Sequence, residues 1–289
     1  MNASFVFLNY KDAATCKKAC LAIAEFQSID HIVIVDNCSS DDSSEQLCSL
    51  QNEKIIVIQT EANKGYSYGF NYGIQYVRDH FASEYVFICN TDVIVGENTL
   101  MKCIQTLEQN PQFGAVSTNE TDFQGRPLRC AWSAPTWKDE VLYCFYIYRR
   151  FILPKKRKKE RKFSGEVEIV DSVAGNFTCY RLDAFLLAGM YDDSFFLYNE
   201  ENIIGQRLRK VGYQVALLPK ESYIHNHKGK RTSFPPFSID RMKKIKEKNS
   251  GYNYQVKYNH IGKLKAAILW MSICIAMLEA SAIKLFKGK

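Results

Sequence analysis

The sequence predicts an α/β fold, with one mostly parallel sheet that carries helices on both faces and a helical segment at the C-terminus. Short apolar runs rich in β-branched residues alternate with helical patterns through the first half of the chain, as is typical of a parallel sheet. Two of these runs, at 31–36 and 85–92, stop abruptly at carboxylate and amide side chains. A buried parallel strand ends in this way when its carboxyl end opens into a ligand crevice.

The alternation is most regular in the first 118 residues. Strands are expected at residues 4–8, 31–35, 55–59, 85–90 and 115–118. Helices are expected at residues 13–26, 42–50, 71–81 and 98–109, and Asn110-Pro111 ends the last of them.

The regular alternation of strand and helix patterns is lost between residues 119 and 164 and then returns. The irregular stretch carries Trp132, Trp137 and a basic run, and we interpret it as a lid or substrate loop. Beyond it, strands are expected at residues 169–174, 177–180 and 215–218, and helices at residues 182–188 and 202–211. Gly212 follows the last helix, at a position where glycine commonly ends a helix.

The last 28 residues differ from the rest in composition. Residues 266–278 are almost wholly apolar and have lysines on both sides, and Glu279 interrupts the run. A membrane-spanning helix needs about 20 apolar residues. We therefore favour a helix that lies in the membrane interface, or docks there as a hairpin, over a true span. A buried core helix is the remaining alternative.

The net charge of +7 is concentrated in two basic clusters, at 155–162 and 241–248. Such clusters suit an anionic partner, and we expect a membrane surface, since nothing else in the sequence indicates nucleic-acid recognition. A solvated loop is an equal alternative for the first cluster. The ten cysteines include no Cys-x-x-Cys pair, which favours buried thiols in a reducing compartment. The apolar run at 5–8 is too short for a signal peptide, so a cytosolic location is expected.

Two segments are candidates for contacts with a nucleotide. Asp36 could accept a hydrogen bond from a pyrimidine ring N–H or a ribose hydroxyl, or it could cap the helix that follows. The segment 63–73 is rich in glycine and opens a helix, so its backbone could approach a ligand closely. The same Asn-x-Gly pattern also occurs in ordinary turns.

Two further sites could carry chemistry. Asp92 could bind a divalent cation together with diphosphate oxygens and either His225 or His227. Glu200 and Glu201 follow an aromatic run, and adjacent carboxylates in such surroundings favour a raised pKa in one of them, as a general base requires. The alternative for this pair is an acidic first turn of the next helix.

In their order along the chain, these elements resemble the family-2 inverting glycosyltransferases of the GT-A fold, particularly the bacterial rhamnosyltransferase-like branch. The resemblance extends from Ser4 to Ser233. It rests on Leu8-Asn9-Tyr10, Val35-Asp36-Asn37-x-Ser39, Asn63-x-Gly65 with Gly69, Asn71 and Gly73, Asn90-x-Asp92, Gly175-Asn176 before Arg181, Gly189-Met190-Tyr191-Asp192, Phe196-Leu197-Tyr198-Asn199-Glu200-Glu201, Arg207, Gly212-Tyr213 and His225.

The resemblance implies transfer of one hexosyl or deoxyhexosyl unit, with inversion, from a nucleotide-diphosphate sugar (UDP or dTDP) to a surface polysaccharide such as capsule or O-antigen. The acceptor would be lipid-linked. Glu201 would act as the general base, and Glu200 would orient it. Asp92 would bind Mg²⁺ or Mn²⁺ with the help of His225 or His227. The residues expected around the nucleotide sugar are Asn9, Tyr10, Asp36, Asn37, Asn63, Gly65, Asn71, Asn90, Thr91, Gly175, Asn176 and Arg207.

The same reading divides the chain at residue 240. Residues 1–240 would form the GT-A domain, with a nucleotide-binding half at 1–118 and an acceptor and catalytic half at 119–240. Residues 241–289 would form a basic, helical, membrane-associated region. The protein would work in the cytoplasm at the inner face of the plasma membrane, as a monomer or a homodimer, held peripherally by its C-terminal helix and basic clusters.

Three positions depart from the family pattern. Asn90 replaces the first of two paired aspartates, Glu201 replaces the usual Asp, and Ile203 stands where a further acidic residue is expected. A catalytically inactive homologue, which binds nucleotide sugar and acts as a membrane-bound scaffold, is therefore the alternative.

Overall fold

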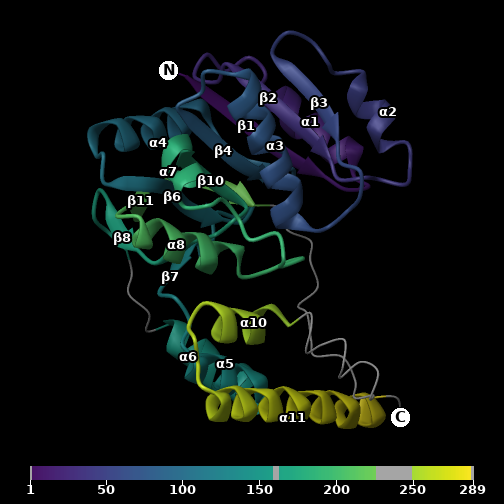
Figure 1. Cartoon of the computed structure of the whole chain (residues 1–289), viewed down its shortest axis with the longest axis vertical. Coiled ribbons are helices and arrows are strands. Elements are labelled where there is room, and N and C mark those ends of the chain that lie inside the picture. The colour runs from purple at the N-terminus through teal and green to yellow at the C-terminus, as the bar shows by residue number, and fades with distance from the viewer. Residues whose placement is uncertain (1, 159–162, 226–248, 288–289) are drawn as a thin grey trace. The chain divides into compact units, whose positions relative to one another are not determined.

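The computed structural model describes residues 2–158, 163–225 and 249–287. The chain forms two compact units (Figure 1). Unit 1 comprises residues 1–133 and 163–227, and unit 2 comprises residues 134–162 and 228–289. The predicted boundary at residue 240 lies outside the described residues, so that division of the chain stays a prediction.

Unit 1 is built on a nine-stranded sheet with the order β3-β2-β1-β4-β10-β6-β11-β5, and β8 also pairs with β11. The strands of this sheet are β1 (Ala3–Asn9), β2 (His31–Asp36), β3 (Ile55–Gln59), β4 (Tyr85–Asn90), β5 (Val93–Ile94), β6 (Phe113–Thr121), β8 (Glu168–Val170), β10 (Phe177–Arg181) and β11 (Gln214–His225). A separate two-stranded sheet pairs β7 (Ala131–Trp132) with β9 (Ser172–Val173).

The large sheet is mostly parallel, as the sequence predicts. Neighbours among β1, β2, β3 and β4 run in the same direction, and so do β6 and β11. β10 is the central exception, because it is antiparallel to both β4 and β6. This reversal brings the beginning of β10 to the edge at which β4 ends.

Helices cover both faces of the sheet (Figure 1). One apolar core lies under α1 (Ala13–Ile23), α2 (Ser43–Cys48) and α4 (Glu97–Gln109). The other lies under α3 (Tyr66–His80), α7 (Leu182–Leu187) and α8 (Glu200–Lys210). Strand residues alternate between the two cores: Phe5 and Phe7 belong to the first and Val6 to the second. Because both faces are covered, strands such as β2 and β4 consist largely of continuous apolar runs.

Three elements differ from the sequence prediction in ways that affect function. α3 begins at Tyr66 instead of residue 71, directly after Gly65. α8 begins at Glu200 instead of residue 202, so both glutamates lie in its first turn. β11 was expected to stop at residue 218 but continues to His225 through a bulge between Leu218 and Ser222.

Unit 2 is helical in its described parts. It contains α5 (Trp137–Cys144), a π-helical turn η1 (Tyr148–Ile152), α6 (Leu153–Lys158), α10 (Ser250–Lys257) and α11 (Lys263–Lys287). Thr136 and Asp139 form a capping box at the start of α5. The expectation of an irregular segment at 119–164 is therefore wrong for its central part, which folds into α5, η1 and α6.

α11 is longer than the apolar run that predicted it. Its residues Lys263–Ile283 have a mean hydropathy of 1.9 and are long and apolar enough to cross a membrane. One face nevertheless packs inside unit 2, where Leu269, Ile273 and Ala276 form a core with Cys144 of α5.

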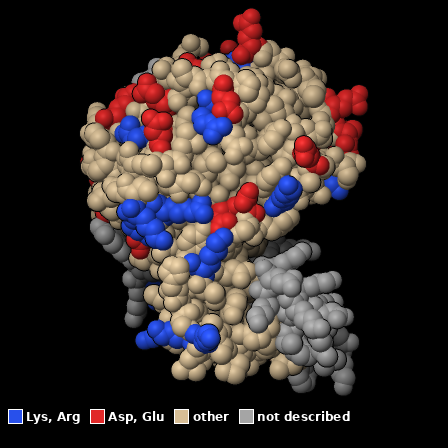
Figure 2. Space-filling view, in the orientation of Figure 1, with Lys and Arg blue, Asp and Glu red and all other residues tan. Residues whose placement is uncertain are grey.

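Charge divides unevenly between the units. Counted over the sequence, unit 1 has 14 Lys and Arg against 25 Asp and Glu, a net charge of −11. Unit 2 has 24 against 6, a net charge of +18. In Figure 2 the red acidic side chains gather over the sheet unit, and the described part of the helical unit is mostly tan with blue side chains.

Candidate active site

The carboxyl ends of the parallel strands form one rim of the sheet in unit 1. Asn9 at the end of β1 pairs with Asp36 at the end of β2, and Leu8 pairs with Asn90 at the end of β4. Asn176, just before the reversed strand β10, reaches the same rim, because its carbonyl accepts a hydrogen bond from the Asn90 backbone N–H at 2.8 Å. Residues far apart in the sequence therefore meet at a single edge.

Asp36 is fully buried, and its carboxylate is held by the protein. Oδ1 accepts hydrogen bonds from Asn9 Nδ2 at 2.8 Å and Ser39 Oγ at 2.6 Å. Oδ2 accepts from the Ser39 backbone N–H at 3.1 Å and from Gln59 Nε2 at 3.1 Å. A carboxylate offers about four acceptor positions, so a nucleoside contact at Asp36 would have to replace one of these bonds.

Asn37 connects the end of β2 to the turn before α3. Its Nδ2 donates to Asn63 Oδ1 at 3.1 Å and to the Gly65 carbonyl at 3.2 Å, and its Oδ1 accepts from Thr60 at 3.0 Å. Gly65 has φ +107°, and a Cβ there would overlap the carbonyl of Phe196. Only glycine fits this close approach of two backbones.

Tyr10 and Thr91 lie on the same rim with fewer restraints. Tyr10 follows β1 and is 49% exposed, with the Lys11 ammonium 5.3 Å from its ring centroid. Thr91 lies in the turn between β4 and β5 and is half-exposed. Both are accessible to a ligand at the rim.

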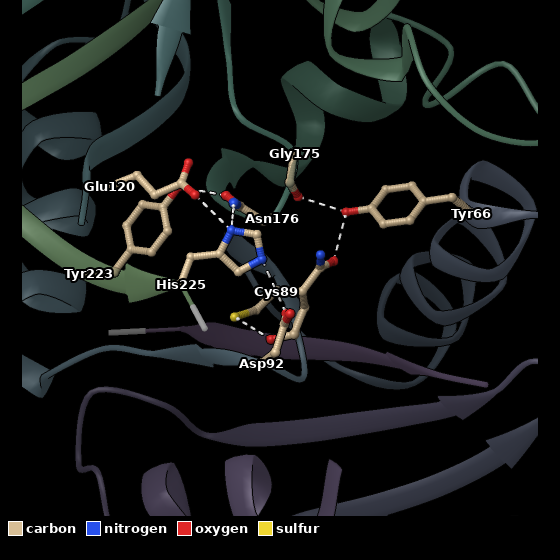
Figure 3. A network of polar contacts seen from close by, with 9 residues as sticks. Tyr66, Cys89, Asp92, Glu120, Gly175, Asn176, Tyr223 and His225 are labelled. Atoms are coloured by element: carbon tan, nitrogen blue, oxygen red, sulfur yellow. Dashed lines mark hydrogen bonds and ion pairs between the residues drawn. The ribbon is translucent and has the colours of Figure 1, made fainter. Parts of the chain in front are cut away.

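Asp92 and His225 form the pair that the sequence proposed as metal ligands. Val93 of β5 pairs with His225 at the end of β11, and this pairing carries Asp92 to the histidine. His225 Nε2 lies 3.3 Å from Asp92 Oδ1 (Figure 3). The second candidate, His227, lies outside the described residues.

Glu120 on β6 holds the other side of the imidazole. Its Oε1 lies 2.7 Å from His225 Nδ1 (Figure 3), and its side chain is buried. The amide of Asn176 is 2.7 Å from the same ring nitrogen, and the Tyr223 hydroxyl donates to Asn176 Oδ1 at 2.5 Å. In the imidazolium form of His225, Nδ1 donates to the ionised carboxylate of Glu120, which can only accept, and Nε2 is directed toward Asp92.

The charges around His225 favour a cation at this position. Burial disfavours the imidazolium, but hydrogen bonds to Asp92 and Glu120 outweigh it and raise the pKa of His225 to about 9. The pair therefore binds a proton between Asp92 and Nε2 at neutral pH, and a divalent ion could take its place. A carboxylate behind a histidine ligand is the usual support of a metal-binding imidazole.

Asp92 and His225 fit a cation site that the protein completes only in part. Among residues 2–158, 163–225 and 249–287, no group of three or more His, Cys, Asp or Glu side chains could hold a metal ion. Two protein ligands leave most positions of a hexacoordinate ion to diphosphate oxygens and water, as is common for Mg²⁺. The geometry therefore suits an ion that binds together with a diphosphate.

Gly175 and Asn176 connect the Asp92–His225 pair to the two glutamates of α8. A Cβ at Gly175 would lie 3.2 Å from Glu201 Cγ and 3.3 Å from its Oε1, so Glu201 packs directly against this glycine. The Tyr66 hydroxyl donates to the Gly175 carbonyl at 2.7 Å (Figure 3). It also lies 3.3 Å from Asn90 Oδ1. The glutamates and the candidate metal ligands thus flank one short segment.

Glu200 and Glu201 both have carboxyls that are hard to ionise. Burial, together with the charge of Glu201, raises the pKa of Glu200 well above its ordinary value. Burial also raises the pKa of Glu201. Glu200 Oε2 is buried and has no hydrogen-bond partner in the described part of the chain. A carboxylate with a raised pKa is a stronger base near neutral pH than an ordinary glutamate.

Asn71 and Arg207 have structural contacts away from the rim. The Asn71 amide exchanges two hydrogen bonds with the backbone of Tyr191, at 3.0 and 3.2 Å. Arg207 Nη1 donates to the carbonyls of Gly189 and Met190, both at 2.8 Å. Both side chains line a cavity of about 280 Å³ beside this loop. Arg207 lies six residues beyond Glu201 on α8, roughly 9 Å along the helix, so it is not gathered with the glutamates.

Glu120, Tyr66 and Tyr223 are the site residues that the sequence analysis missed. Glu120 is a charged residue in a strand that is otherwise mostly buried, and this contrast is the local signal that could have indicated it. The two tyrosines resemble ordinary core aromatics, and only their hydroxyl contacts distinguish them.

The mostly parallel sheet with its reversed strand β10, covered by helices on both faces, has the GT-A fold of solved glycosyltransferases. The chain belongs to glycosyl transferase family 2, whose family model matches residues 6–177. It is a glycosyltransferase, and its relatives include hexosyl- and rhamnosyltransferases.

Two curated relatives and one solved structure illustrate this relationship. The low-salt glycan biosynthesis hexosyltransferase Agl10 of Haloferax volcanii is 26% identical over 231 residues, which cover 80% of this chain and 69% of the relative. The N-acetylglucosaminyl-diphospho-decaprenol L-rhamnosyltransferase of Mycobacterium tuberculosis is 23% identical over 216 residues, covering 72% and 69%. The mannosyltransferase PcManGT of Pyrobaculum calidifontis, solved with GDP-Man and Mn²⁺, has a TM-score of 0.58 at 14% identity and covers 99% of this chain and 74% of its own.

Proposed function

We propose that the protein transfers one sugar, with inversion, from a nucleotide-diphosphate donor to a lipid-linked surface glycan. The observation that carries this proposal is the Gly175–Asn176 segment, which touches Glu201 on one side and His225 on the other. A base for the acceptor and ligands for the leaving diphosphate would then act on a sugar held between them.

Glu201 is the proposed general base. Its carboxylate would remove the proton of the acceptor hydroxyl while that oxygen forms a bond to the anomeric carbon of the donor sugar. The bond from that carbon to the phosphate oxygen breaks, and the nucleoside diphosphate leaves from the opposite face. Burial raises the pKa of Glu201, which supports this role near neutral pH.

Asp92 and His225 are the proposed ligands of Mg²⁺ or Mn²⁺. Such an ion would stabilise the negative charge that develops on the departing diphosphate. Glu120 would keep the imidazole of His225 turned toward Asp92, since it lies 2.7 Å from Nδ1. The Mn²⁺ bound in the mannosyltransferase of Pyrobaculum calidifontis supports a divalent ion in this fold.

The nucleoside would lie along the rim formed by the ends of β1, β2 and β4. The rim residues proposed to contact or shape the nucleotide sugar are Asn9, Tyr10, Asp36, Asn37, Asn63, Gly65, Asn90, Thr91, Gly175 and Asn176. Asn71 and Arg207 would act indirectly, by holding the loop 189–192. We propose UDP or dTDP as the nucleotide.

The acceptor and the location are proposed from the relatives and from unit 2. The mycobacterial relative is named for a rhamnosyl transfer to a diphospho-decaprenol acceptor. A lipid-linked acceptor of this kind would place the protein at the cytoplasmic face of the plasma membrane. The long apolar helix α11 and the basic composition of unit 2 support that location.

A thermal-shift screen tests the donor site first. UDP-, dTDP- and GDP-sugars are compared, each with and without Mn²⁺, on the wild-type protein and on Asp92→Ala. We expect one nucleotide class to raise the melting temperature of the wild type only with metal, and this metal dependence to disappear in Asp92→Ala. If no donor shifts the wild-type protein, the proposed donor site is contradicted, whereas a donor-dependent shift without transfer of any sugar would favour the scaffold alternative.

A transfer assay with the donor identified in that screen then tests the base. Glu201→Gln should abolish transfer and leave the donor-dependent thermal shift unchanged. Normal turnover by this variant would remove Glu201 as the base.

A further inference from the structure

α11 has two faces with opposite properties. On one face, Leu269, Ile273 and Ala276 are buried against α5 and α10. The other face is exposed and apolar, and we call it the outer stripe: Leu264 (75% exposed), Met271 (56%), Ile275 (43%) and Leu278 (52%). These positions are 7, 4 and 3 residues apart, so they lie along one side of the helix.

Exposed apolar surface is concentrated in unit 2. Of the 23 large hydrophobic side chains that are exposed in the described part of the chain, 11 belong to this unit. Besides the outer stripe and Val256, they are Leu142, Tyr143, Tyr146, Ile147, Phe151 and Ile152, in and after α5. The outer stripe runs along one side of α11, and an exposed apolar surface of this kind marks an interaction site more often than a single exposed hydrophobic residue does.

The charge of the same unit indicates the partner. Lys263 and Lys265 flank Leu264 at the start of α11, and Arg150 and Lys155 are exposed beside Phe151 and Ile152. Unit 2 has a net charge of +18. Cations beside an aliphatic stripe suit a surface of anionic lipids, because the headgroups pair with the cations and the acyl chains contact the apolar side chains. A nucleic acid would pair with the cations only.

The packing of α11 decides between a spanning helix and one that lies along the membrane. The Tyr146 backbone N–H donates to Glu279 Oε2 at 2.9 Å, which joins α11 to the segment after α5. If α11 crossed the bilayer with these contacts intact, α5 and its neighbours would carry Lys138, Arg149 and other charges into hydrocarbon. Charged groups are strongly disfavoured there.

We propose that unit 2 docks on an anionic lipid surface with α11 lying in the plane of the membrane. The outer stripe inserts between the headgroups, and Lys263 and Lys265 contact their phosphates. The inner face stays packed on α5 and α10. This gives a physical basis for the membrane location proposed above, and it does not depend on the transfer reaction.

Vesicle sedimentation of the full-length protein tests this surface. Vesicles of phosphatidylcholine alone are compared with vesicles that also contain phosphatidylglycerol. The variant Met271→Gln/Ile275→Gln/Leu278→Gln replaces three of the four residues of the outer stripe, and Leu21→Gln/Leu187→Gln is the control, since both leucines are exposed in unit 1 (51% and 64%). We expect the stripe variant to bind anionic vesicles at least about tenfold more weakly than wild type, and the control to bind as wild type does.

A second variant addresses the charges without touching the apolar face. Lys263→Gln/Lys265→Gln should weaken binding to anionic vesicles severalfold and leave binding to neutral vesicles unchanged. This comparison tests whether unit 2 binds anionic headgroups even if the stripe variant fails to fold.

Three results would overturn the proposal. Equal vesicle binding by the stripe variant and wild type would exclude the outer stripe as the surface that inserts into the membrane. Retention of wild type on vesicles after an alkaline carbonate wash would show that α11 is inserted across the bilayer. Binding to duplex DNA, without binding to vesicles, would identify a nucleic acid as the anionic partner. A wild type that binds vesicles but no nucleotide sugar would count against the proposed function and leave this surface standing.

Discussion

Glu120 is a buried carboxylate that contacts the side chains of His225 and Tyr223. It pairs with Tyr223 in the β6–β11 ladder. The next residue, Thr121, pairs with Ile224, which directly precedes His225. Glu120 Oε1 is 2.7 Å from the imidazole Nδ1, and the Tyr223 hydroxyl approaches Glu120 Oε2 at 3.4 Å. Such a residue orients a metal ligand without touching the metal, and the loss of an orienting carboxylate weakens metal affinity.

We therefore expect Glu120→Ala to weaken Mn²⁺ binding by about 10- to 100-fold, as is typical when a carboxylate behind a metal-binding histidine is lost. Titration of Mn²⁺ in the presence of nucleoside diphosphate, followed by electron paramagnetic resonance, measures this directly. Thr118→Val is the matched control, because Thr118 lies on the same strand and its buried hydroxyl has no hydrogen-bond partner among the described residues. Unchanged Mn²⁺ affinity in Glu120→Ala would contradict the orienting role.

The raised pKa of Glu200 predicts that the stability of the folded protein depends on pH. Burial raises its pKa in the folded protein, so folding favours its protonated form. The corresponding contribution to stability is complete below the ordinary pKa of a glutamate and is lost as pH rises through the folded value. Glu200→Gln stays neutral, so its stability relative to wild type should increase from pH 4 to pH 8, by about 1.4 kcal/mol for each unit of pKa shift.

Urea unfolding of both proteins at the two pH values measures this difference. Glu53→Gln serves as the control, because Glu53 is exposed in the loop before β3. A constant difference in the free energy of unfolding across pH would show that Glu200 ionises normally.

At the scale of elements, the start of α3 and the loop before α8 are joined at one point. The Tyr66 backbone N–H donates to the Phe196 carbonyl at 2.9 Å, and Gly65 lies directly against that carbonyl. α3 begins here on the nucleotide side of the rim, and the loop leads to the glutamates of α8. The two sides of the site are thus fixed to each other by a backbone contact.

Gly65→Ala should therefore destabilise the protein. The residue has φ +107° and no room for a Cβ, and such backbone strain costs on the order of 1–3 kcal/mol before the overlap is counted. Gly125→Ala separates the two effects, because Gly125 also has a positive φ (+71°) but no atom within 4 Å of its added Cβ. The free energies of unfolding in urea should decrease more for Gly65→Ala than for Gly125→Ala, and equal decreases would contradict the close contact.

The sheet could be predicted from sequence because its strands are buried on both sides. Continuous apolar runs such as Ile55–Gln59 and Tyr85–Asn90 have no other common explanation, and their bounds agree with the structure. The continuation of β11 to His225 could not be predicted in this way. Residues 219–225 begin with a proline followed by three polar residues, and they become a strand only through pairing with β6 and β5, which are far away in the sequence.

The positions of site residues could be predicted where these residues follow strand ends. They could not be predicted where tertiary packing determines the contacts of the side chain. Asp92 was expected to meet either His225 or His227, and the β5–β11 pairing brings His225 to it. Asn71 and Arg207 belong to the same motifs, yet their side chains satisfy backbone groups of the loop 189–192. Motif spacing does not distinguish a ligand contact from a loop contact, because both use the same polar groups.

At the scale of the whole molecule, the two units have separate cores and opposite charge. Among the described residues, the sheet cores of unit 1 include none from unit 2, and the core around Leu269 and Ile273 includes none from unit 1. A ligand stabilises only the structure to which it binds.

Scanning calorimetry of the full-length protein should therefore give two unfolding transitions. A donor nucleotide with Mn²⁺ should raise the temperature of one transition, that of unit 1, and leave the other in place. Anionic vesicles should shift the temperature of the other transition, that of unit 2. A single transition that moves as a whole with donor would show that the two cores unfold cooperatively.

The reversed strand β10 also affects the order in which a ribosome completes the site. β1 to β4 are consecutive in the chain and adjacent in the sheet, so the nucleotide side of the rim can assemble once about a third of the protein has emerged. Gly175, Glu201 and His225 all come later, in the second stretch (163–227) that unit 1 contributes. At about 5–20 residues per second, the nascent chain could bind a nucleotide for several seconds before it could react with it. Translation thus delivers the reactive groups last.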